Sequence, residues 1–284
     1  MFEFLQKKGI DPKKLLKKVL GDYELPSFPD VVLKTLEKIR DPNVDAHSIA
    51  DVLSNDPNLT VKVLKTVNSA AFSPVKEIEN LQQAIALMGM SSLESLVLSM
   101  GVNKALPNKK TGSFDPTLFW LGSARRAYVA KAISQVLHPQ KNMECFTAGL
   151  LQDMAVPLLV SSREKEYEPI LKAWGNDKRR LHELEQEAFG WDHAEVATWM
   201  CAEWQLPENL ASAIGGHNQK EDDGQFERPS AVYLVSLIRN SRENPGTDLL
   251  IEEAVNTYSL EKDSLNGILE ESFEKAEELV SIIS

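Results

Sequence analysis

The chain has 284 residues, of which 43% are hydrophobic and 26% charged, enough apolar material for one large domain or two smaller ones. A formal net charge of −11 repels a phosphate backbone, so we expect no nucleic acid among its partners. Cys145 and Cys201 lie in apolar surroundings without CxxC spacing. They predict buried thiols in a reducing compartment and exclude a disulfide framework.

Residues 1–24 form a basic N-terminal segment. Within residues 1–20, lysines outnumber acidic side chains, and Gly9 and Pro12 interrupt short amphipathic turns. We expect these lysines to be the solvated face of a docked helix; the alternative is contact of residues 1–20 with a membrane surface. The N-terminus lacks the apolar core of a signal peptide, and no apolar run approaches the roughly 20 residues of a membrane span. The expected location is therefore cytoplasmic, with no transmembrane segment.

From Leu25 onward the apolar residues recur at helical spacing. The pattern predicts a helix around residues 32–39, a second over 46–53 capped by Asp45, and a third that begins at Asp56-Pro57. An apolar stripe over residues 81–88 stops at Gly89, and the capping box of residues 91–94 then predicts a new helix.

Residues 106–115, rich in Pro, Asn, Lys and Gly, predict the boundary where two lobes meet. Beyond them, further helices are expected at residues 116–137, around 152–153, and at 180–189, 192–204, 207–215, 229–240, 248–256 and 265–280. Strand-like alternation is absent. The sequence therefore predicts an all-α fold in two helical lobes, with residues 221–284 packing on the second.

Asp153 is a single carboxylate in the apolar run of residues 147–155. A buried carboxylate needs a cationic partner, a metal ion or several hydrogen bonds. His193 falls on an apolar helical stripe with Ala197 and Met200, whereas His217 follows two glycines and is expected to be exposed. Asp153 and His193 could form a buried structural pair, or all three side chains could hold an ion together with water.

Several sequence blocks occur in the order typical of one family. They are Leu25-Pro26-Ser27-Phe28-Pro29, then residues 55–60, 67–72 and 84–89, followed by 119–130, 148–153, 189–196, 204–207 and 213–218. Over residues 25–220 the chain resembles the HDOD domain family, the regulatory relatives of the HD and HD-GYP phosphohydrolases. This resemblance implies an HD-like multi-helical bundle.

The resemblance also implies where a metal would lie. In catalytic relatives an early histidine, a His-Asp pair and a late aspartate hold the first ion; here these positions carry Gly122, Gln152-Asp153 and Ser236. Asp153 is the residual ligand of that set, while His193 and His217 match positions of the second set. Neither glycine nor a neutral amide replaces a histidine ligand well.

We therefore expect a non-catalytic HDOD-type module of bacterial signal transduction that binds signalling proteins and needs no cofactor. The alternative is a divalent-metal-dependent phosphohydrolase acting on phosphomonoesters or phosphodiesters, with Mn, Fe, Zn or Mg held by Asp153, His193 and His217.

Overall fold

The computed structural model describes residues 11–69, 72–176, 179–220, 228–241 and 245–283. Within these ranges the regular structure is helical, apart from an isolated bridge between Thr111 and Phe114. The predicted all-α fold is confirmed. Residues 1–10 of the basic segment and residues 221–227 of the C-terminal region lie outside the described residues.

The first group of helices is α3 (Asp30–Ile39), α4 (Ala46–Leu53), α5 (Pro57–Val67) and α6 (Leu81–Ala105). The two predicted caps are present: Asp45 accepts from the Ser48 amide, and Asp56 accepts from the amides at the start of α5. The break predicted at Gly89 is confirmed: Gly89 takes a non-helical conformation (φ 76°, ψ 165°), so α6 consists of two helical segments joined at a kink.

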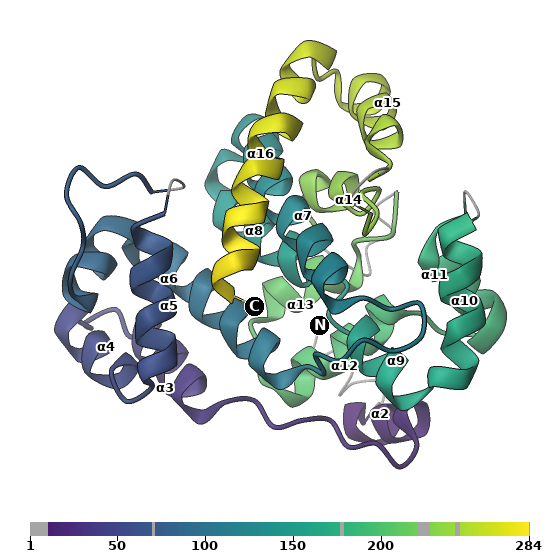
Figure 1. Cartoon of the computed structure of the whole chain (residues 1–284), viewed down its shortest axis with the longest axis horizontal. Coiled ribbons are helices and arrows are strands. Elements are labelled where there is room, and N and C mark those ends of the chain that lie inside the picture. The colour runs from purple at the N-terminus through teal and green to yellow at the C-terminus, as the bar shows by residue number, and fades with distance from the viewer. Residues whose placement is uncertain (1–10, 70–71, 177–178, 221–227, 242–244, 284) are drawn as a thin grey trace.

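The N-terminal helix α2 (Pro12–Leu20) lies away from the first group and packs on α12 (His193–Glu203). Residues 21–29 cross the lower edge of the molecule in Figure 1 to reach α3. Leu16, Val19 and Leu20 are buried, whereas the lysines of α2 are exposed, as expected for a docked helix. Trp204 Nε1 donates to the Pro26 carbonyl over 2.9 Å and fixes the crossing segment.

The second group surrounds α7 (Pro116–Leu137) and α8 (Asn142–Leu151), which the short 3-10 helix η1 (Pro139–Lys141) connects. These two helices pack closely because Gly149 has no side chain: a Cβ there would lie 2.9 Å from the Arg126 carbonyl oxygen. The close approach places Arg126 of α7 beside the end of α8. The remaining helices are α9 (Val156–Ser162), α10 (Glu164–Asn176), α11 (Leu181–Phe189), α12, α13 (Glu208–Gly215) and α14 (Ser230–Val235).

At the C-terminus, α15 (Thr247–Tyr258) leads into the long helix α16 (Lys262–Ile283), which lies along α7 and also contacts α5 (Figure 1). Leu265, Ala276 and Leu279 of α16 are buried. The helix predicted over residues 229–240 was too long. It ends at Val235, and the chain then turns so that the Arg239 amide donates to the Pro245 carbonyl.

Two stretches, Leu81–Ala105 and Pro139–Ser162, are long and apolar enough by length and composition to cross a membrane. The expectation that no apolar stretch approaches this length was therefore wrong. In the two stretches, 61% and 83% of the most apolar window is buried inside the fold. Such burial is what the core helices of a globular domain show, since their apolar faces contact other helices.

Candidate functional site

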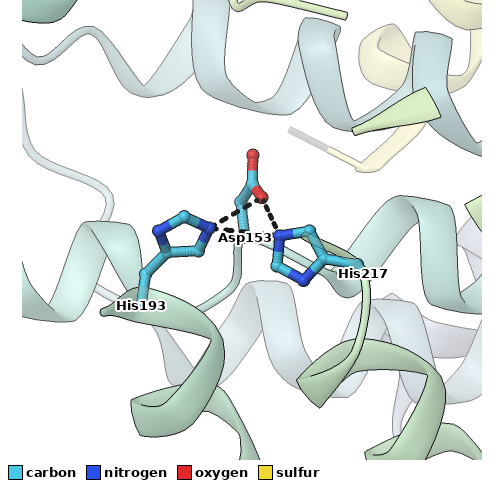
Figure 2. Close-up of side chains that lie close together, drawn as sticks. All are labelled: Asp153, His193 and His217. Carbon is cyan, nitrogen blue, oxygen red and sulfur yellow. Dashed lines mark hydrogen bonds and ion pairs between the residues drawn. The ribbon is translucent and has the colours of Figure 1, made fainter. Parts of the chain in front are cut away.

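Asp153, His193 and His217 come together from three separate elements, as Figure 2 shows. Asp153 follows α8, His193 is the first residue of α12, and His217 follows α13. The two Nε2 atoms lie 3.2 Å apart, and each lies 3.5 Å from Asp153 Oδ1. All three ligand atoms thus face one point. The expectation that His217 is exposed was wrong, since only 1% of its surface is accessible.

Each histidine is oriented through its other ring nitrogen. His193 Nδ1 lies 2.5 Å from Glu185 Oε2, which also accepts from the His193 amide, and Tyr167 donates to the other oxygen of Glu185. His217 Nδ1 donates to the Ile214 carbonyl over 2.6 Å. These contacts direct both Nε2 atoms toward Asp153, the arrangement by which proteins orient metal-binding histidines.

The charges of the site are balanced within the protein. Burial lowers the pKa of His193, but the carboxylates of Glu185 and Asp153 outweigh it and raise that pKa well above its usual value. Burial lowers the pKa of His217, so its ring is neutral. The protonated His193 Nε2 can therefore donate to His217 Nε2. A proton between the two rings satisfies the same atoms that an ion would bind.

Arg126 is the cationic partner of Asp153. Its Nη2 lies 2.9 Å from Asp153 Oδ2, and this ion pair, against the effect of burial, holds the pKa of Asp153 well below its usual range. The guanidinium also donates to Ile238 O, Asn240 Oδ1 and Ser123 Oγ. Arg126 is 1% exposed, so its guanidinium belongs to the buried site and not to a solvated helix face.

The positions that would complete a first ion site do not supply ligands. A Cβ on Gly122 would lie 1.9 Å from Asn240 Oδ1 and 3.2 Å from Asn240 Cα, so no histidine fits there with Asn240 in place. Gln152 is buried, and its Oε1 has no hydrogen-bond partner in the described part of the chain. Ser236 Oγ accepts from Arg180 Nη2 over 2.5 Å. Arg126 and Asn240 therefore fill this side of Asp153.

The residues present fit one divalent ion, not two. Two ligand atoms about 2.1 Å from a tetrahedral ion lie about 3.4 Å apart, close to the observed separations of 3.2 and 3.5 Å. His193, His217 and Asp153 Oδ1 would hold the ion and leave a position for water. Arg126 occupies Asp153 Oδ2, so the carboxylate cannot bridge to a second ion.

A small cavity of about 40 Å³ reaches the site. Asp153, Arg180, His193, Asn218 and Ser236 line it, together with Arg239 and apolar side chains. Arg180 Nη2 donates to Asn218 Oδ1 and Ser236 Oγ, which fixes the guanidinium at the cavity wall. A cavity of this size holds a few water molecules, whereas pockets for small-molecule ligands usually enclose about 300–1,000 Å³.

The fold and the site define an all-helical domain with a buried His–His–Asp cluster at the meeting point of α8, α12 and α13. The HDOD domain model matches residues 25–220. The chain belongs to the HDOD domain family.

Solved structures with the same fold cover nearly the whole chain. A proposed phosphohydrolase from Shewanella amazonensis SB2B aligns with a TM-score of 0.75 and 20% identity, over 95% of this chain and 98% of that one. An HDOD domain protein of unknown function from Geobacter sulfurreducens aligns with a TM-score of 0.67 and 20% identity, over 96% and 97%. At this identity the likeness establishes the fold.

An uncharacterised protein of Treponema pallidum is 23% identical over 196 residues, which are 69% of this chain. The chain covers 38% of the length of that relative. The relative is thus a longer protein of which a part resembles this domain.

Sequence reasoning missed Arg126, Glu185 and Tyr167, all of which act on the site. Arg126 lies within the apolar residues of α7, and Glu185 lies among the acids of α11. An arginine in an otherwise apolar helix is a usable signal, since charged residues are seldom fully buried unless paired. Nothing distinguishes Glu185 from its exposed neighbours except its place on the buried face of α11.

Proposed function

We propose that this protein is a non-catalytic HDOD module of bacterial signal transduction that acts by binding partner proteins. The observation that carries the proposal is the buried ion pair between Arg126 Nη2 and Asp153 Oδ2 at 2.9 Å. A permanently charged guanidinium takes the carboxylate oxygen that a second metal ion would need. A two-ion hydrolytic centre is therefore incompatible with this site.

The space around the cluster supports the same proposal. The cavity that reaches Asp153 and His193 has a volume of about 40 Å³, and both histidines are almost fully buried. A phosphomonoester or phosphodiester does not fit in this volume unless side chains that line the cavity move. The site holds its own charges in balance, as expected of a buried network that stabilises a fold.

A hydrolase assay tests whether the protein lacks phosphohydrolase activity. The purified protein is incubated with p-nitrophenyl phosphate and bis(p-nitrophenyl) phosphate in the presence of Mn²⁺, Fe²⁺, Zn²⁺ or Mg²⁺. We expect no turnover above that of Asp153→Ala or His217→Gln. Metal-dependent turnover that both substitutions abolish, in variants that retain their helical circular-dichroism spectrum, would overturn the proposal.

Partner binding is tested separately by chemical cross-linking of the full chain in its native cells. If the module acts by binding, a partner cross-linked to the wild-type chain should also be captured by His217→Gln. Capture of the same partner by both chains supports the proposal. If the folded His217→Gln protein no longer captures that partner, partner binding depends on the His–His–Asp cluster, which would contradict the proposal.

The second candidate is a phosphohydrolase with one divalent ion. It is favoured by the convergence of His193 Nε2, His217 Nε2 and Asp153 Oδ1, because three protein ligands and one water are typical of catalytic zinc sites. A bound ion would lower the pKa of that water. Elemental analysis of protein purified without added metal discriminates the candidates: one equivalent of ion, lost in His193→Gln and His217→Gln, would favour the enzyme.

A further inference from the structure

A second cavity, which shares no lining residue with the cavity at the His–His–Asp cluster, lies where α6, α7, α8 and α16 meet. It has a volume of about 210 Å³. Met88 and Leu96 of α6, Phe146 of α8 and Leu279 of α16 form its apolar wall. By comparison, an engineered apolar cavity of about 150 Å³ is sufficient to bind benzene. The cavity can therefore accept a small ligand with an apolar body.

One side of this cavity carries positive charge. Lys131 of α7 and Lys275 of α16 both line it. Lys275 Nζ forms an ion pair with Glu271 Oε1 at 2.5 Å, whereas the half-buried Lys131 ammonium has no acceptor among the described residues. Burial and the neighbouring Lys275 lower the pKa of Lys131. The wall thus has one positive charge that no protein carboxylate compensates.

Further hydrogen-bond donors face the same space. Ser272 is 4% exposed, and its hydroxyl has no partner within the described part of the chain. Tyr128 also lines the cavity, and burial raises its pKa to about 12, so its phenol stays protonated and can donate. Tyr128 packs edge-on against Phe146, with ring centroids 5.2 Å apart, which fixes the phenol beside the apolar wall.

We propose that this cavity is a binding site for a small amphipathic carboxylic acid. The hydrocarbon or aryl body lies against Met88, Leu96 and Phe146, and the carboxylate accepts hydrogen bonds from Lys131 and Ser272. A single uncompensated cation matches a monoanion, and a carboxylate accepts several donors in charge-assisted hydrogen bonds. The C-terminal helix α16, which lies beyond the family-matched residues 25–220, supplies Ser272, Lys275 and Leu279 to the cavity.

The methionines on the cavity wall provide a local readout. Protein labelled with ¹³C at the methionine methyl groups is titrated with octanoate and with its neutral analogue octanamide. Met88 and Met143 line the cavity, whereas Met154 and Met200 are buried elsewhere. We expect octanoate to shift the Met88 and Met143 signals in a saturable manner. Absence of such shifts overturns the proposal.

Three variants locate the carboxylate and the body of the ligand. Lys131→Gln should weaken octanoate binding by about tenfold or more, which corresponds to the loss of one charge-assisted hydrogen bond, and should change octanamide binding much less. Lys38→Gln, at an exposed lysine of α3, is the matched control and should bind as wild type does. Ser92→Phe fills the cavity from its rim and should abolish both interactions.

Equal octanoate affinity in wild type and Lys131→Gln contradicts the assignment of the carboxylate. Persistent octanoate shifts in Ser92→Phe contradict the assignment of the cavity. Unchanged Met154 and Met200 signals in each variant verify that the core is intact, so that a loss of binding is attributed to the cavity.

Discussion

Replacing Arg126 with methionine should destabilise the fold strongly, because it removes the cation that pairs with Asp153. The guanidinium is 1% exposed and makes contacts of 2.9 Å with Asp153 Oδ2 and 2.8 Å with Asn240 Oδ1. Breaking one side of a buried ion pair costs about 3–5 kcal/mol. The imidazolium of His193 still faces Asp153 and compensates part of the charge. We therefore expect a loss of about 3 kcal/mol.

The neighbouring Arg125→Met is a matched control on the same helix. Arg125 donates to Ser241 O over 2.6 Å, lies 3.8 Å from Glu277, whose side chain is 47% exposed, and stacks on Phe273. Solvent screens that ion pair, so the expected loss is about 1–2 kcal/mol.

Urea-induced unfolding followed by circular dichroism measures both losses. The double variant Arg126→Met/Asp153→Asn removes both charges of the ion pair. Its loss of unfolding free energy should therefore be smaller, by about 2 kcal/mol, than the sum of the losses in Arg126→Met and in Asp153→Asn. The reasoning is refuted if Arg126→Met costs no more than Arg125→Met. It is also refuted if the losses of Arg126→Met and Asp153→Asn add up to that of the double variant.

Three further predictions follow from other features of the chain. Gly122→Ala should lower the unfolding free energy by about 1–3 kcal/mol, because its Cβ would lie 1.9 Å from Asn240 Oδ1; a chain as stable as wild type in urea would contradict this close approach. Burial lowers the pKa of His182 to about 3. Below a pH of about 6.5, His182 is protonated in the unfolded chain but not in the folded chain. The unfolding free energy therefore falls as the pH drops toward the folded-state pKa. Thermal unfolding of His182→Gln should show a smaller loss on acidification, and equal losses in both chains would be inconsistent with this sign. The four lysines of α2 should give co-sedimentation with anionic vesicles that disappears at an ionic strength of about 0.15 M, since the apolar face of α2 is buried on α12; binding that resists salt would argue for insertion instead.

Local signals in the sequence were sufficient for most helix starts. Asp45, Asp56 and Asp192 each cap the helix that the pattern predicts, because a short acidic side chain before a helical run satisfies free amides through contacts within a few residues. The break expected at Gly89 is present as well. Its positive φ of 76° is a conformation that glycine adopts without strain, and it separates the two helical segments of α6.

The site was only partly predictable. The sequence identifies Asp153, His193 and His217 as candidate ligands, and the fold brings them together. It does not reveal that Arg126 meets Asp153, because that contact depends on the close packing of α7 on α8 at Gly149. The burial of His217 was missed for a similar reason: the turn after α13 directs the ring inward through its hydrogen bond to Ile214.

Two covalent links join the first group of helices to the remainder of the molecule. One is the loop between α6 and α7, and the other is the segment of residues 21–29, which leaves α2 on α12 and reaches α3 (Figure 1). Nine residues span about 30 Å at most, so the distance between the end of α2 and the start of α3 has an upper limit. The separation of α3 from α2 and α12 therefore cannot exceed the extended length of this segment, which limits how far the first group of helices can move from the second.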